Sequence, residues 1–149
     1  MTKSETALKI RPAQLRDQKI VHTLLSEFKL PRDGLEETKL WVLQSSKGEV
    51  IGVAGLEVHG NQGLLRSVAV IKSMRNQGYG TSIANHIIGE AKKRKLQNLF
   101  LLTTTAPAFF RRLGFKEENR EKVASSITNS VESKNACPKT AILMRLPLT

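Results

Sequence analysis

The chain has 149 residues, of which 40% are hydrophobic, 25% are charged and 5% are aromatic, and this length suits one compact domain over residues 1–149. No stretch approaches the ~20 apolar residues of a membrane helix, and the N-terminus lacks the charged-then-apolar layout of a secretory signal. The single cysteine, Cys137, excludes an internal disulfide and a cysteine-based zinc cage. We therefore expect a single-domain protein of the reducing cytoplasm.

The composition is strongly basic. Lysine and arginine total 24 against 13 acidic residues, and the resulting formal net charge of +11 favours nucleic acid, an anionic membrane surface or a highly phosphorylated small molecule as partner. With one Tyr and one Trp, the chain lacks the stacking aromatics of a single-strand nucleic-acid binder. The densest basic run is Lys92–Lys95, and nucleic-acid binding through it ranks last among the functions considered.

The first half of the chain predicts a strand, a helix and three further strands. Asp17 is placed to begin the helix, whose apolar residues recur at helical spacing, and the segment 30–34 (LPRDG) ends it as a loop. The predicted ranges are 6–11 for the first strand, 20–28 for the helix, and 40–43, 49–58 and 64–71 for the later strands.

The second half predicts an amphipathic helix over 81–95 and a short, continuously apolar strand over 99–102 (LFLL), which is the pattern of a central strand. A short helix over 106–113 and a last strand over 140–146 follow, and the polar stretch 118–139 carries no clear pattern. Strands interrupted by helices indicate an α/β fold of the α+β sandwich kind.

The turn at 59–63 (HGNQG) predicts a hairpin that brings two charged side chains together. If Gly60 faces Gly63, then Glu57 faces Arg66. Opposed residues of an antiparallel pair lie ~5 Å apart at Cβ, so these side chains are expected to meet on one face unless a bulge shifts the register.

The segment 75–80 (RNQGYG) joins an apolar strand to a helix. Gly78 and Gly80 allow close backbone approach to a ligand, and a helix N-terminus offers unpaired N–H groups, so the segment predicts a pyrophosphate cradle. It lacks the Gly-Lys-Ser/Thr ending of a Walker loop and the spacing of a dinucleotide fingerprint. The alternative is a glycine turn that only caps the helix.

Four blocks in this order resemble the GNAT acetyltransferases: Leu65–Val70, Arg75-x-x-Gly78-x-Gly80, Leu99–Thr105 and Phe109–Phe115. Within that superfamily, Gly55–Glu57, Leu64–Ser67, Leu101–Ala106 and Cys137-Pro138 resemble the arsenic-resistance N-acetyltransferase branch. The segments 99–104 and 140–144 are similar to the acetyltransferase domain of N-acetylglutamate synthase. The resemblance implies a mixed, largely antiparallel sheet of six to seven strands flanked by about four helices.

The resemblance implies acetyl-CoA as co-substrate, with no metal. The backbone of one strand would hold the pantetheine arm, the amides of the glycine segment would wrap the pyrophosphate, and an arginine would lie beside it. The residues expected to bind acetyl-CoA are Val68, Ala69, Val70, Arg75, Asn76, Gln77, Gly78, Tyr79, Gly80, Thr81 and Phe110.

Two catalytic positions depart from the superfamily, since Leu64 stands where many members carry a Glu base and Phe110 where many carry a Tyr acid. An ammonium has no lone pair with which to attack a thioester, so a base is still needed at neutral pH. Glu57 is the candidate base, and a structural ion pair with Arg66 is the alternative. Thr103 is a candidate to stabilise the departing thiolate or relay a proton, or else it only satisfies local backbone.

For the acceptor, the resemblance points to the amine of an amino acid or an amino-acid-like toxic compound. Arg66 would either orient Glu57 or bind the acceptor's carboxylate, and Arg32 and Thr140 are further candidates for the acceptor. Pro138 stands where glutamate synthases carry an Arg. A protein or peptide acceptor and a non-catalytic acyl-CoA-binding regulator are the alternatives. The three histidines predict no metal site, His59 is expected in a surface turn, and a homodimer is expected by analogy.

Overall fold

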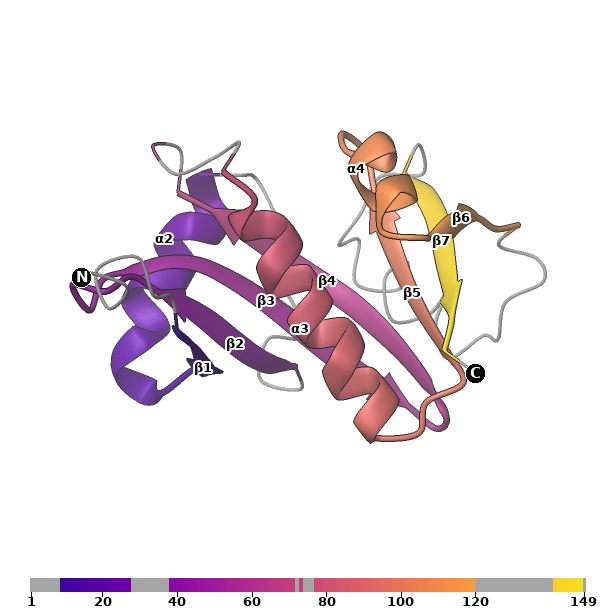
Figure 1. Cartoon of the computed structure of the whole chain (residues 1–149), viewed down its shortest axis with the longest axis horizontal. Coiled ribbons are helices and arrows are strands. Elements are labelled where there is room, and N and C mark those ends of the chain that lie inside the picture. The colour runs from indigo at the N-terminus through magenta and orange to yellow at the C-terminus, as the bar shows by residue number, and fades with distance from the viewer. Residues whose placement is uncertain (1–8, 28–37, 72, 74–76, 120–140, 149) are drawn as a thin grey trace. The chain divides into compact units, whose positions relative to one another are not determined.

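The structure is a computed structural model that describes residues 9–27, 38–71, 73, 77–119 and 141–148. Within these ranges the chain forms seven β-strands, three α-helices and one 3-10 turn (Figure 1). The strands are β1 (Lys9–Pro12), β2 (Lys39–Gln44), β3 (Val50–His59), β4 (Gln62–Val70), β5 (Asn98–Thr103), β6 (Lys116–Glu117) and β7 (Ile142–Pro147). The helical elements are η1 (Leu15–Asp17), α2 (Gln18–Glu27), α3 (Tyr79–Lys93) and α4 (Pro107–Arg112).

The strands form one sheet in the order β1-β2-β3-β4-β5-β7-β6. The pairs β1–β2, β5–β7 and β6–β7 are antiparallel, whereas β4 and β5 are parallel. A parallel pair needs a crossover connection, and α3 supplies it between β4 and β5. The predicted mixed, largely antiparallel α/β fold is therefore confirmed.

The chain divides into two compact units, and β3, β4 and α3 contribute residues to both. Unit 1 takes the described residues up to Gly55 together with Ser67–Ile87, and unit 2 takes Leu56–Arg66 and the described residues from Ile88 onward. None of the described helices has the length and apolar character needed to span a bilayer.

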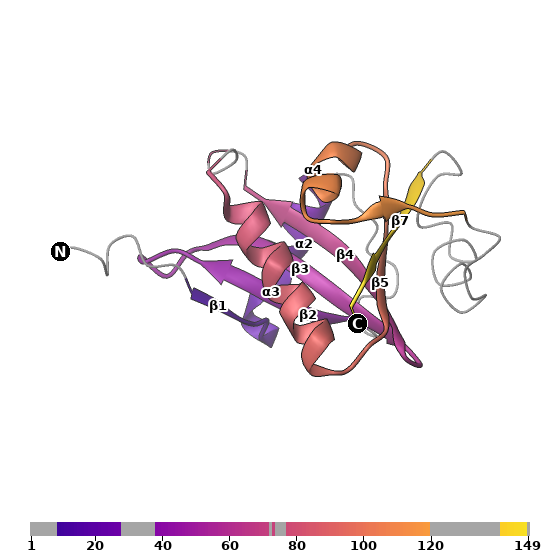
Figure 2. The ribbon, with the colours of Figure 1, turned by 45° about the vertical axis from the view of Figure 1, so that its right-hand side comes forward.

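In unit 1, two helices cover opposite faces of the strands. Val42 of β2 packs in an apolar cluster with Leu24 and Leu25 of α2. The ring of its neighbour Trp41 lies 5.9 Å from the ring of His86 of α3. Because successive residues of a strand point to opposite faces, α2 and α3 lie on opposite sides of this part of the sheet, as both ribbon views show (Figure 1, Figure 2).

In unit 2, the apolar run of β5 is buried on both faces, as its unbroken hydrophobic pattern predicts. Leu99 and Leu101 are fully buried on one face. Phe100 on the other face packs in a cluster with Leu64 of β4 and Leu143 of β7. The parallel ladder between β4 and β5 pairs Gln62–Leu64 with Asn98–Phe100, so Leu64 lies directly beside Phe100.

Two local features differ from the prediction. Helix α3 begins at Tyr79, two residues before the predicted start, so Gly80 lies in its first turn. The hairpin turn holds only Gly60 and Asn61, because His59 still belongs to β3 and Gln62 already belongs to β4. Gly60 has a φ of 63°, a conformation that glycine adopts without steric cost and that allows so short a turn.

An enclosed ion pair joins the start of the chain to η1. Arg11 donates from its two terminal nitrogens to both oxygens of Asp17, at 2.8 and 3.0 Å, and from Nε to Gln44 of β2 at 2.9 Å. Asp17 also accepts the backbone N–H of Gln14 at 2.7 Å. Asp17 lies directly before α2, where the sequence places it, and through Arg11 the ion pair connects β1, β2 and η1.

The hydrogen bond from Arg11 holds the pKa of Asp17 below its usual value. A depressed carboxyl pKa contributes stability above the unfolded value near 4, and this contribution is lost as the pH falls toward the folded value. We therefore expect Asp17→Asn to lower the free energy of unfolding by about 2 kcal/mol at pH 7, with a smaller difference at pH 3.5. Urea unfolding at both pH values measures this, with the exposed Glu27→Gln as control. A difference that does not shrink in acid would contradict the assignment.

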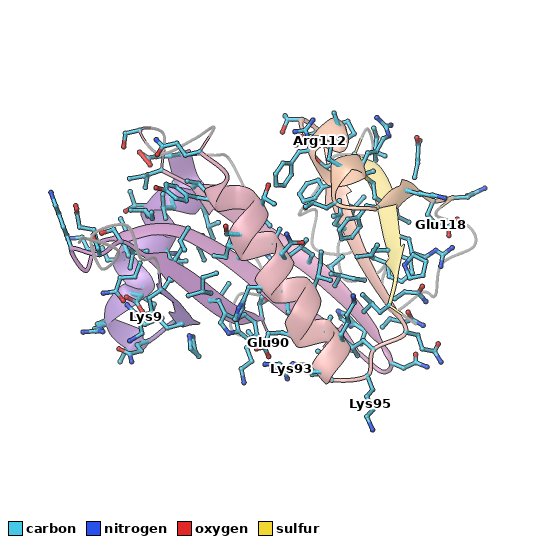
Figure 3. The ribbon with its side chains drawn as sticks, in the orientation of Figure 1. Lys9, Glu90, Lys93, Lys95, Arg112 and Glu118 are labelled. Carbon is cyan, nitrogen blue, oxygen red and sulfur yellow. The ribbon has the colours of Figure 1, made fainter. Side chains whose placement is uncertain are left out.

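Helix α3 ends in a Schellman motif whose left-handed residue is a lysine. Lys95 has a φ of 60°, its N–H donates to the Lys92 carbonyl, and the N–H of Leu96 donates to the Ala91 carbonyl. Figure 3 shows the Lys95 side chain extending away from the end of the helix. The position therefore carries the steric cost of a Cβ in the left-handed region.

We expect Lys95→Gly to stabilise the protein by about 0.5–1 kcal/mol, although glycine normally destabilises helical segments. For a domain of this size that gain raises Tm by about 1–4 °C. Thermal unfolding followed by circular dichroism checks it. Lys95→Ala removes the same charge but keeps the Cβ, so it is expected to leave Tm unchanged, and an equal gain in both variants would refute the explanation.

Candidate active site

Among the described residues of unit 2, the most enclosed charged cluster is built on the β3–β4 hairpin. The side chain of Glu57 is only 6% exposed, and its Oε2 accepts a 2.7 Å hydrogen bond from the guanidinium of Arg66. The predicted contact between these two residues is therefore confirmed. Arg66 is itself 14% exposed, so the pair is largely shielded from solvent.

A third residue, His59, completes this cluster and was missed by the sequence analysis. Its Nε2 lies 2.8 Å from Oε1 of Glu57, and its side chain is 24% exposed. The expected surface turn is wrong, because His59 is the last residue of β3. The signal was present in the spacing, since residues i and i+2 of a strand share one face. We refer to Glu57, His59 and Arg66 as the hairpin cluster.

The described part of the glycine segment, residues 77–80, leads into α3 in unit 1, and the helix begins at Tyr79. The first intrahelical bond runs from the Ser82 N–H to the Gly78 carbonyl at 3.0 Å, so the N–H groups of Gly78–Thr81 precede the helical ladder. Gly78 has a φ of 84°, which explains why a glycine is needed there, and a Cβ on it would meet no atom within 4 Å. The site thus has the exposed N–H groups and the positive dipole end that anions bind.

The strand before this segment carries a strained residue. Ser67 of β4 has a φ of 62°, which costs a non-glycine residue about 1–2 kcal/mol, and it is buried. It directly precedes Val68, Ala69 and Val70, the part of β4 expected to bind the pantetheine arm. Nothing in the sequence pattern predicts this strain, and strained backbone residues cluster at functional sites.

Thr103 and Phe110 lie in unit 2. Thr103 is the buried last residue of β5, and its hydroxyl accepts the backbone N–H of Ala106 at 3.0 Å, just before α4. Thr103 therefore makes the hydrogen bond to nearby backbone that the sequence analysis gave as the alternative to a catalytic role. Phe110 of α4 is buried, with its ring in edge-to-face contact with Phe109 and Phe115 at centroid distances of 4.9 and 5.9 Å.

The remaining predicted site residues lie either at the start of α3 or outside the described residues. Gln77 and Thr81 are exposed, and Tyr79 is half-buried, all at the start of α3. The candidates Arg32, Arg75, Asn76 and Thr140 lie outside the described residues, as do Cys137 and Pro138. Within the described ranges, no group of three or more His, Cys, Asp or Glu side chains is placed to hold a metal ion.

Comparison with known proteins identifies the family. The sequence matches the acetyltransferase (GNAT) domain family over residues 36–117, which is more than half of the chain. The chain belongs to the GNAT acetyltransferase family. An uncharacterised N-acetyltransferase of Chlorobaculum tepidum is 26% identical over 106 residues, covering 70% of this chain and 66% of that protein. The predicted acetyltransferase class is thereby confirmed.

Solved structures show the same GNAT fold. Rv2747 from Mycobacterium tuberculosis, solved in complex with CoA, has a TM-score of 0.80 at 24% identity over 95% of this chain and 99% of that chain. N-acetylglutamate synthase from Neisseria gonorrhoeae, complexed with coenzyme A and N-acetyl-glutamate, has a TM-score of 0.82 at 23% identity, over 97% of this chain but 36% of that chain. The ribosomal-protein-S18-alanine N-acetyltransferase of Escherichia coli has a TM-score of 0.74 at 20% identity, over 96% and 95%.

Proposed function

We propose that this GNAT protein transfers the acetyl group of acetyl-CoA directly to the amine of a small amino acid or an amino-acid-like toxic compound. The observation that carries the proposal is the buried Glu57 carboxylate, held between Arg66 and His59 on one hairpin. The whole chain acts as one acetyltransferase domain, and we place it in the cytoplasm, with a homodimer as its assembly.

Glu57 is the general base. The acceptor amine is an ammonium at neutral pH and must lose a proton before its nitrogen can attack the thioester carbonyl. The attack forms a C–N bond and a tetrahedral oxyanion, and collapse breaks the C–S bond to release CoA. The Glu57 carboxylate accepts a hydrogen bond from Arg66 of β4 and is hydrogen-bonded to the ring of His59 of β3, and strand-borne groups are held more precisely than groups on loops.

Acetyl-CoA binds along the end of β4 and the start of α3. The backbone N–H groups of residues 76–81 wrap the pyrophosphate, with Arg75 beside it. The backbone of Val68, Ala69 and Val70 holds the pantetheine arm. This assignment is supported by the helix N-terminus described above and by the strained Ser67. The protein's net charge of +11 favours so anionic a co-substrate.

The residues beyond the base have narrower roles. Phe110 stands where many family members carry a tyrosine, so as an acetyl-CoA-binding residue it supplies no proton. The Thr103 hydroxyl oxygen accepts the backbone N–H of Ala106, and its own hydrogen is directed to the departing thiolate.

Arg66 both orients Glu57 and attracts the acceptor's carboxylate, with Arg32 and Thr140 as further substrate residues. Arsenic- or phosphorus-containing amino acids are the toxic acceptors we consider first.

Acetyl transfer to a defined panel tests the proposal. The protein is incubated with acetyl-CoA and the twenty amino acids, together with L-phosphinothricin, while CoA release and the acetyl mass gain of each acceptor are recorded. Acetylation of an amino acid or of phosphinothricin supports the proposal. CoA release with a protein N-terminus or lysine as the only acceptor favours the second candidate, which the likeness to the ribosomal-protein enzyme of Escherichia coli supports. Tight acetyl-CoA binding without any transfer would instead indicate a non-catalytic regulator.

A further inference from the structure

The hairpin cluster contains one residue that the proposed reaction does not yet use. Glu57 has one oxygen bound to Arg66 at 2.7 Å and the other bound to the ring of His59 at 2.8 Å. The side chains differ in exposure: 6% for Glu57, 14% for Arg66 and 24% for His59. His59 is therefore the cluster member with the greatest access to solvent.

Arg66 and His59 differ in what they can do with a proton from Glu57. A guanidinium stays protonated throughout the working pH range, so Arg66 can donate to the carboxyl group but cannot take a proton from it. An imidazole has two ring nitrogens and can accept a proton at one while it releases a proton from the other. A buried base must pass its proton onward in every turnover, and His59 is the partner equipped for that step.

We infer that His59 relays the proton that Glu57 removes from the acceptor ammonium to bulk water. This inference rests on the proposed role of Glu57 as base. The N–H bond of the ammonium breaks as an O–H bond forms on Glu57. In the ring tautomer whose hydrogen is on Nδ1, the Glu57 proton then moves to the free Nε2 of His59, the imidazolium gives its Nδ1 proton to water, and exchange with water restores the starting tautomer. The carboxylate is thereby restored, and the net change is one proton delivered to solvent.

The fold places His59 for this step without a mobile loop. Glu57 and His59 are separated by one residue on β3, so both side chains leave the same face of the strand. The turn at Gly60 and Asn61 follows at once, which leaves His59 at the end of the hairpin where its ring is half-buried. A relay held by a strand end and a two-residue turn needs no conformational change.

Two substitutions separate a relay from a merely structural contact. His59→Gln keeps a side-chain amide that can hydrogen-bond Glu57 but carries no titratable proton, whereas His59→Ala removes the ring and leaves space for a free imidazole. With acetyl-CoA and the fastest acceptor of the amino-acid and phosphinothricin panel, both variants are expected to lose about tenfold or more in kcat. Their KM for acetyl-CoA should stay within twofold of the unaltered protein. Added imidazole should restore His59→Ala in proportion to its concentration and should not restore His59→Gln.

The same assay on Glu57→Gln distinguishes the relay from the base on which it depends. If Glu57→Gln and both His59 variants are slow and imidazole rescues His59→Ala, the relay is supported. If Glu57→Gln is slow but His59→Gln has normal kcat, the relay is overturned and the base stands. If Glu57→Gln has normal kcat, both roles fall together. Combining Glu57→Gln with His59→Gln should be no slower than Glu57→Gln alone, because residues that act in one step are not additive.

Discussion

Glu57→Gln is expected to lower kcat by about 10²–10³-fold, because the acceptor ammonium then has no adjacent carboxylate to take its proton. The amide is close to the carboxylate in shape and can still hydrogen-bond Arg66 and His59, so the hairpin should stay folded. The KM for acetyl-CoA should change less than twofold, since its proposed binding residues do not include Glu57. Steady-state CoA release with the fastest acceptor measures both constants, and thermal unfolding checks the fold.

Glu118→Gln is the matched control for this substitution. Glu118 also accepts an arginine hydrogen bond, from Nε of Arg145 at 2.8 Å, and its side chain is 23% exposed. Figure 3 shows Glu118 beside β6, at the border of the described segment. The control repeats the loss of one carboxylate from an Arg–Glu pair outside the hairpin cluster, so kcat should remain near normal. A fall of equal size in both variants would assign the effect to lost ion pairing rather than to a base.

The second large effect is expected at the start of α3, where Gly80→Val should weaken acetyl-CoA binding at least tenfold, or by about 1.4 kcal/mol. Gly80 lies in the first turn, among the N–H groups that precede the helical ladder. A branched side chain there keeps these N–H groups but places its bulk where the pyrophosphate must approach them. Isothermal titration calorimetry with acetyl-CoA measures the change directly.

Gly89→Val on the same helix controls for the change in helix propensity. A Cβ on Gly89 would meet no atom within 4 Å, so valine is tolerated there, nine residues beyond Gly80. It is expected to leave acetyl-CoA affinity unchanged, while Gly80→Val lowers it at a similar Tm. Undiminished binding by Gly80→Val would remove the pyrophosphate cradle from the proposal, whatever the acceptor panel shows.

The elements with the clearest residue patterns were predicted closely from the sequence. Strand β5 has a continuous apolar run and helix α3 has an apolar stripe at helical spacing. Both ends of each element lie within two residues of the predicted ends. The start of α3 was placed late, because Tyr79 and Gly80 add nothing to the apolar stripe and glycine usually marks a loop. Helix bounds that depend on local backbone conformation carry little periodic signal, so they were the weaker predictions.

The candidate site was predicted in part. The contact of Glu57 with Arg66 was predicted correctly, but the register used to predict it was wrong, because Gly60 lies in a two-residue turn and does not face Gly63. His59 was assigned to the predicted turn, and the actual two-residue turn extended β3 by one residue and moved His59 onto the face of Glu57. The left-handed Ser67 and the bond between Thr103 and Ala106 had no sequence signal, because serine and threonine are common in many backbone settings.

The sequence alone determined the family, the order of the elements and the glycine segment that begins α3, because these depend on residue type and on spacing along the chain. Only the tertiary structure decided which side chains meet and how far each is removed from water. Burial turns the sequence neighbours Glu57 and His59, together with Arg66 from the next strand, into the enclosed cluster on which the proposed base and relay depend. That enclosure depends on the packing of several strands at once, which no local pattern of residues encodes.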